Sequence, residues 1–88
     1  MENLGNTQYF KVQKDAPITV EETIKQVYAA LKEKGYNPIS QMVGYIMSGD
    51  PTYITSHNNA RSLISKVERD ELVEELMNHY VNSNGLDG

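Results

Sequence analysis

Apolar residues recur at helical spacing between residues 19 and 34. Their positions are Val20, Ile24, Val27, Tyr28 and Leu31. Offsets of 4, 7, 8 and 11 from the first position place these side chains on one face of a helix. Thr19 and Glu22 have the spacing of a capping box, in which each side chain bonds the backbone N–H of the other. Gly35 suits the left-handed position after a helix, so we predict a helix over 19–34.

The next segment has the same kinds of signal: a cap, apolar residues at helical spacing and a terminating glycine. Asn37 is a predicted N-cap, and Pro38 fits the first helical position because its missing N–H would have no partner there. The apolar positions that follow are Ile39, Met42, Val43, Ile46 and Met47. Gly49 is the predicted stop. Gly44 inside the helix costs about 1 kcal/mol relative to alanine; it is either tolerated or allows another helix to approach closely.

The last third of the chain contains shorter signals. Asp50 and Pro51 predict a single turn, and Ser56 or Asn58 is a candidate cap for a short helix that continues through Leu63 and Ile64. Residues 65–68, "SKVE", have capping-box spacing and predict the start of the last helix. Its inward residues are predicted to be Leu72, Val73, Leu76, Met77, Tyr80 and Val81, and Gly85 is its predicted end. That stripe is broad for a small core, so part of it is a candidate surface for a partner chain.

These patterns predict an all-α fold, a compact bundle of four to five helices over residues 19–88. Residues 1–18 form a separate non-helical segment in this interpretation. A chain of 88 residues favours one domain. A domain of this size buries roughly 60–65% of its unfolded surface, and such thin cores often gain stability from oligomers.

Composition narrows the functional classes. The chain has no cysteine, which excludes disulfides and thiolate metal sites. No apolar run approaches the roughly 18 residues of a membrane helix, and no signal-peptide pattern opens the chain. We therefore expect a soluble cytoplasmic protein without membrane insertion. The net charge is −4, and residues 68–88 contribute six acids against one arginine.

Candidate catalytic and metal-binding residues are few. Glu75 and His79 are four residues apart, a spacing found in metal sites, but such sites need three or four ligands. A solvent-exposed pair is the favoured interpretation, and His57 is interpreted as a loop histidine. The sequence shows no activated nucleophile and no phosphate-binding glycine motif. We expect no catalysis, no metal and no cofactor.

Three cations, Arg61, Lys66 and Arg69, form the one weakly basic segment. They either pair with the acidic last helix or form a docking patch for a carboxylate or phosphate. A nucleic-acid-binding regulator that uses Arg61 to Arg69 is the alternative function. The acidic net charge opposes it, because such binding depends on clustered cations that neutralise phosphates.

The N-terminal stretch "NLGNTQYFKVQ", residues 3–13, shows no helical period. It contains Thr7 and an aromatic pair, Tyr9 and Phe10, and it precedes the capped helical body. That position would make it accessible to a modifying enzyme.

Two long segments carry a family resemblance: "VYAALKEKGYNPISQMVGYIMSGDPTYI", residues 27–54, and "NARSLISKVERDELVEELMNHYV", residues 59–81. Together they resemble the IreB/ReoM family, small regulatory phosphoproteins of Gram-positive bacteria. The resemblance implies a helical homodimer without enzyme activity. It also implies phosphorylation by a membrane-bound Ser/Thr kinase with extracellular peptidoglycan-sensing repeats, reversed by a partner phosphatase.

The regulated process is also implied by the resemblance. The unmodified form would promote degradation, by a Clp-type protease, of the enolpyruvyl transferase that starts peptidoglycan precursor synthesis. Phosphorylation would relieve this effect, so cell-wall synthesis and antibiotic resistance would rise.

The resemblance places the phosphothreonine at Thr7, and we interpret Tyr9 and Phe10 as an anchor for this tail. A second threonine of some members is replaced here by Leu4. Acidic residues that often follow the aromatic pair are replaced by Lys11 and Lys14.

Family arginines match Arg61 and Arg69, whereas another stands where this chain has Ser56 or His57. A phosphate on Thr7 adds about −1.5 to −2 charge. It would then either pair with Arg61 or Arg69 or repel the acidic surface.

Overall fold

The computed structural model describes residues 18–86, and every regular element in that range is helical. The elements in chain order are the helix α2 (Val20–Glu33), the helix α3 (Pro38–Ser48), the 3-10 turns η1 (Pro51–Tyr53) and η2 (His57–Asn59), the helix α4 (Ala60–Ser65) and the helix α5 (Arg69–Ser83). The predicted all-α fold is therefore confirmed for this part of the chain.

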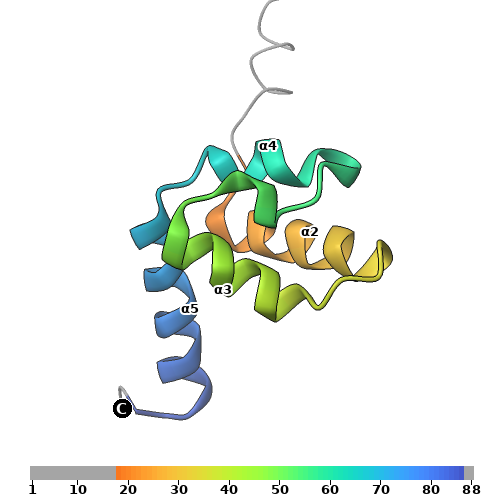
Figure 1. Ribbon diagram of the computed structural model, residues 1–88. Coiled ribbons are helices and arrows are strands. Elements are labelled where there is room, and N and C mark those ends of the chain that lie inside the picture. The colour runs from red at the N-terminus through yellow and green to blue at the C-terminus, as the bar shows by residue number, and fades with distance from the viewer. Residues whose placement is uncertain (1–17, 87–88) are drawn as a thin grey trace, which may run out of the picture.

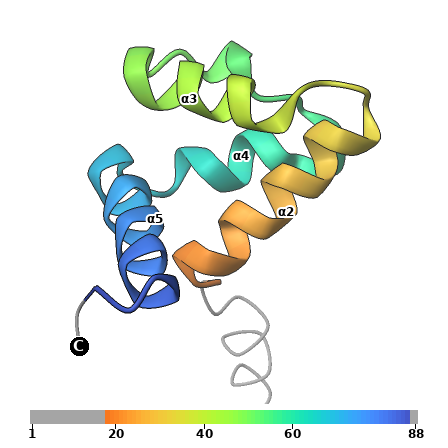
Figure 2. The same cartoon turned by 90° about the horizontal axis from the view of Figure 1, so that it is seen from below.

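Helix α2 is the centre of the arrangement, because it contacts α3, α4 and α5 (Figure 1). The core lies between these helices and consists of Val27, Ala30, Leu31, Met42, Tyr45, Ile54, Ala60, Ile64 and Leu72. Helix α5 projects from this group, and its later turns stand beside the beginning of α2 (Figure 2). Much of the α5 surface is consequently left open.

Helices α2 and α3 begin where their predicted caps are. Thr19 Oγ1 accepts a hydrogen bond from the Glu22 backbone N–H at 3.0 Å, and Asn37 Oδ1 accepts one from the Ser40 N–H at 3.1 Å. Gly49 ends α3 in the left-handed region with φ 77°. The observed bounds of α2 lie within one residue of the predicted 19–34, because these caps are local features of the sequence.

Gly44 allows a close approach, but of an aromatic ring rather than a helix. A Cβ at this position would lie 2.6 Å from Cδ1 of Tyr53, the last residue of η1. The Gln41 side chain donates to the Tyr53 carbonyl at 2.9 Å and holds the same turn against α3. A hydrogen atom is therefore the only substituent that fits at residue 44 without displacing the ring.

The predicted capping box at residues 65–68 is wrong. Ser65 is the last residue of α4, and its hydroxyl donates to the Arg61 carbonyl at 2.7 Å. The observed capping box joins Glu68 and Glu71, where Glu71 Oε1 accepts from the Glu68 N–H at 3.0 Å. Ile64 is buried in the core as part of α4, and Ser65 continues that helix. The N-cap of α5 is therefore Glu68, three residues after the predicted cap at Ser65.

Neither candidate cap of the short helix makes a capping bond. Ser56 makes no side-chain bond at the start of η2, and the N-cap position of α4 is occupied by Asn59, also without such a bond, whereas the Asn58 side chain donates to Glu33. Asn58 and Asn59 both adopt left-handed backbone, with φ 54° and 63°, which asparagine tolerates better than most residues. His57, interpreted from the sequence as a loop histidine, is the first residue of η2, and its Nε2 lies 2.7 Å from Glu33 Oε1.

The predicted inward stripe of α5 is largely wrong. Leu72 is buried and Val81 is half-buried, but the four remaining members are exposed: Val73, Leu76, Met77 and Tyr80. The cause is the projection of α5, which leaves its later turns with few neighbours among the described residues. The stripe of α3 is only partly inward, because Ile39, Val43 and Met47 are exposed, and Tyr28 of α2 is exposed as well.

Candidate interaction surfaces

The predicted phosphosite and tail anchor, Thr7, Tyr9 and Phe10, lie outside the described residues 18–86. The candidate cations lie within them. Lys66 is exposed in the short connection between α4 and α5. The two arginines, by contrast, are each bound to backbone of the helical body.

Arg61 is half-buried, and its Nε donates to the carbonyl of the buried Ile54 at 2.8 Å. It faces a surface depression of about 420 Å³ lined by Pro51, Ser56, Asn59, Arg61, Ser62 and Ser65. A guanidinium has five N–H donors, so Arg61 retains donors for a ligand. Lys66 and Arg69 do not line this depression.

The pKa of Asp50 is affected by its neighbours Thr52 and Arg61. The pKa of its carboxyl is lowered below the ordinary value of 3.8, first by the hydrogen bond from the Thr52 backbone N–H and next by the Thr52 hydroxyl. Desolvation opposes this shift, and the charge of Arg61, the weakest of these causes, adds to the lowering of the pKa. The acceptor atom is Asp50 Oδ1, at 3.0 Å from Thr52 N and 2.7 Å from its Oγ1.

Arg69 ties the start of α5 to the end of α3. Its Nη1 donates to the Ile46 carbonyl at 3.0 Å. Its guanidinium also covers Gly49, where a Cβ would lie 2.9 Å from Arg69 Cζ. A cation at a helix C-terminus is favourable because the helix dipole is negative there. Arg69 thus has a structural contact that its sequence position alone did not indicate.

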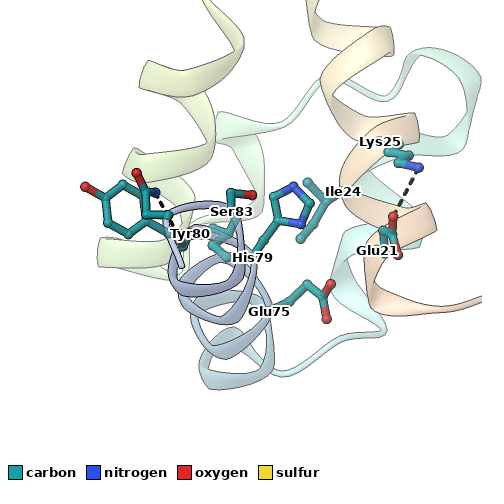
Figure 3. Close-up of a pocket in the computed structure, with 9 residues that line it drawn as sticks. Glu21, Ile24, Lys25, Glu75, His79, Tyr80 and Ser83 are labelled. Carbon is teal, nitrogen blue, oxygen red and sulfur yellow. Dashed lines mark hydrogen bonds and ion pairs between the residues drawn. The ribbon is translucent and has the colours of Figure 1, made fainter. Parts of the chain in front are cut away.

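A groove separates the first turns of α2 from the later turns of α5 (Figure 3). Its volume is about 380 Å³, and its lining consists of Glu21, Ile24, Lys25, Glu75, Leu76, His79, Tyr80, Ser83 and Asn84. Glu21 and Lys25 form an ion pair of 3.1 Å on its α2 side. Glu75 and His79 thus lie on a groove wall, and no group of three possible metal-ligating residues occurs in the described part. We call this surface the α2–α5 groove.

A second apolar surface runs along α3. Ile39 and Met47 are 67% and 78% exposed, and Val43 lies between them at the same helical spacing. No charged residue occurs from Pro38 to Ser48. We call Ile39, Val43 and Met47 the α3 stripe. Within residues 18–86, no helix is both long and apolar enough to cross a membrane.

Comparison with known proteins places the chain in a family. Residues 5–82 match the family model described as IreB regulatory phosphoprotein. The chain is 65% identical over 83 residues to a UPF0297 protein of Lachnoclostridium phytofermentans, with 94% of each protein covered. UPF0297 proteins of Acetivibrio thermocellus and Ruminiclostridium cellulolyticum are 60% and 54% identical; the alignments cover 88% and 89% of this chain and 86% and 89% of those proteins. The chain therefore belongs to the IreB family of regulatory phosphoproteins.

Proposed function

We propose that this chain is a non-enzymatic regulatory phosphoprotein of the cytoplasm that is phosphorylated on Thr7. A transmembrane Ser/Thr kinase adds the phosphate, and a cognate phosphatase removes it. The observation that supports this proposal is the family match, which is described as a regulatory phosphoprotein and which includes Thr7 in its range of 5–82.

The proposed output is control of cell-wall precursor synthesis. In its unmodified form the chain promotes Clp-dependent degradation of the first committed enzyme of peptidoglycan synthesis. Phosphorylation relieves that degradation and raises resistance to wall-active antibiotics. The support is the resemblance of residues 27–54 and 59–81 to the IreB/ReoM family, together with the family membership.

Such a protein acts through surfaces, and two apolar surfaces support a binding role. The α2–α5 groove and the α3 stripe expose large apolar side chains that a protein of 9.9 kDa would otherwise bury. We assign the α3 stripe to a homodimer. Because α3 has no charged residue, pairing it with a second copy brings no like charges together.

A labelling experiment tests the phosphosite. The purified cognate kinase should label the full chain, and Thr7→Ala should abolish that label. Thr52→Ala removes an exposed threonine elsewhere and serves as the matched control that keeps the label. Undiminished labelling of the Thr7→Ala variant would place the phosphate on another residue. Removal of the label by the phosphatase completes the cycle.

A further inference from the structure

The α2–α5 groove has an apolar floor within a polar rim. Ile24 comes from α2, and Leu76 and Tyr80 come from α5. Leu76 is 43% exposed and Tyr80 is 61% exposed, so both keep apolar surface in contact with solvent. Figure 3 shows Ile24 and His79 extending from opposite sides into this space. A groove of this size and character suits one or two apolar side chains of a peptide.

The chain that precedes the described part joins it at the edge of this groove. Glu21, a lining residue, is only three residues after Ile18, the first described residue. Ile18 is eight residues after Phe10, a stretch that spans roughly 26 Å when extended. The α5 wall from Glu75 to Asn84 is only about 14 Å long at helical rise. The N-terminal segment is therefore long enough for Phe10 to reach any part of the groove.

The chemistry of that segment complements the groove. Tyr9 and Phe10 offer adjacent aromatic side chains, and Phe10 is the only phenylalanine in the chain. Lys11 and Lys14 follow them. The charged residues of the groove lining include two acids, Glu21 and Glu75, against one lysine, Lys25, which pairs with Glu21 at 3.1 Å. Aromatic anchors and basic flanks thus meet an apolar floor with Glu75 on its α5 side.

We propose that residues 1–17 dock on their own chain, with Tyr9 and Phe10 in the α2–α5 groove, and that phosphate on Thr7 releases them. Tethering makes a modest contact sufficient, because a short linker gives an effective concentration in the mM range. The release step rests on the proposed function, since it needs Thr7 as the phosphosite. It exposes Leu76 and Tyr80 to other partners.

The direction of the phosphate effect follows from where the charges lie. Three residues of chain span at most roughly 10 Å, which limits how far a phosphate on Thr7 could be from a docked Phe10. The helical rise from Tyr80 back to Arg69 is about 16 Å, and the Arg69 guanidinium is held at the Ile46 carbonyl. A docked phosphothreonine therefore meets Glu75 on the groove wall before it meets Arg69, while Lys25 is paired with Glu21, and like charges repel.

Spin labels can test this docking cleanly, because the chain has no cysteine of its own. A nitroxide is attached to Ser83→Cys on the groove wall, or to Ser62→Cys beside Arg61 as the matched control. The measurement is NMR line broadening of the tail amides of the full chain. We expect at least fivefold stronger broadening at Tyr9 and Phe10 from residue 83 than from residue 62. Phosphorylation of Thr7 should reduce the difference to less than twofold.

Three results would overturn the proposal. One is equal broadening from both labels before phosphorylation. Another is broadening from residue 62 that appears with phosphate, which would place the tail at Arg61. The third is broadening that appears only between a labelled and an isotope-enriched copy in a mixed sample, which would make the occupant the tail of a second chain.

Variants separate the groove from general effects. Phe10→Ala and Leu76→Gln should each abolish the excess broadening. Ile39→Gln, a change of similar size on the exposed α3 stripe, should leave it intact. A kinase-labelled Thr7 without docking would preserve the proposed function and overturn this inference. A docked tail that the kinase does not label on Thr7 would overturn the proposed function and leave the docking in place.

Discussion

Gly44 shows how one missing side chain positions a turn. The Tyr53 ring occupies the space of a Cβ at this residue. Gly44→Ala should therefore lower the free energy of unfolding by about 1–2 kcal/mol, because overpacking costs about 1–3 kcal/mol and the gain in helix propensity returns up to about 1 kcal/mol. Urea unfolding measures the change.

The control for Gly44 is a double-mutant cycle. In a Tyr53→Ala background the ring is gone, so Gly44→Ala should be neutral or stabilising. An equal loss in both backgrounds would contradict the packing explanation and would point to the backbone of α3 itself.

Asp50 gives the fold a dependence on pH. Its pKa is lowered in the folded state by the hydrogen bonds from Thr52 and the charge of Arg61. A lowered pKa means that the carboxylate stabilises the fold above its ordinary pKa of 3.8 and that this contribution is lost as the pH falls through the lowered value. Asp50→Asn keeps an acceptor oxygen without the charge.

The free energy of unfolding of wild type should therefore exceed that of Asp50→Asn most clearly above pH 3.8. The difference should shrink on further acidification. Chemical unfolding of both proteins from pH 7 to pH 2.5 measures it. A constant difference across that range would mean that the Asp50 charge makes no contribution.

At the scale of elements, the helix ends that depend only on local caps were predicted correctly from the sequence. Thr19, Asn37 and Gly49 mark helix ends because their bonds and dihedral angles involve only nearby residues. The start of α5 was predicted three residues too early, because Ser65 and Glu68 have a valid capping spacing in the sequence. The burial of Ile64, a tertiary effect, decided against it.

The observed junction makes its own prediction. Glu71→Ala removes the carboxylate that accepts the Glu68 N–H at the start of α5 and should cost about 0.5–2 kcal/mol of the free energy of unfolding. Ser65→Ala removes a side chain that caps nothing and should change it by less than about 0.5 kcal/mol. Thermal unfolding compares the two variants. A larger loss for Ser65→Ala would restore the capping box at 65–68.

The candidate surfaces were only partly visible in the sequence. The helical period identified the apolar positions of α3 and α5, but not which of them have neighbours. The α2–α5 groove depends on the angle at which α5 leaves the other helices, and no local pattern encodes that angle. The bonds from Arg61 to Ile54 and from Arg69 to Ile46 are equally long-range. The family, by contrast, is evident from the sequence, because the similarity extends over residues 5–82 and does not depend on any single contact.

At the scale of the whole molecule, the proposed dimer can be tested through the α3 stripe. Light scattering should give the wild-type chain about twice the 9.9 kDa monomer mass. Met47→Glu places a charge at the most exposed position of the stripe and should shift the protein toward the monomer. Gln26→Glu adds the same charge to an exposed position of α2 and should leave the dimer intact. A dimer that survives Met47→Glu would have another interface.

In the proposed function, an acidic helical body, two apolar surfaces and an N-terminal threonine act together. The body provides no group of three metal-ligating residues in its described part, and its surfaces suit binding. In that proposal, phosphorylation of Thr7 changes which apolar side chains are open to a partner. Its consequence should be measurable on the degradation of a client enzyme.

Reconstituted proteolysis is the most direct measurement of that claim. The Clp protease, the enolpyruvyl transferase and this chain are combined, and the rate of transferase loss is followed. The unmodified chain should accelerate degradation, the Thr7-phosphorylated chain should not, and Thr7→Ala treated with kinase should accelerate it like the unmodified chain. Equal degradation rates with the unmodified and the phosphorylated chain would contradict the account.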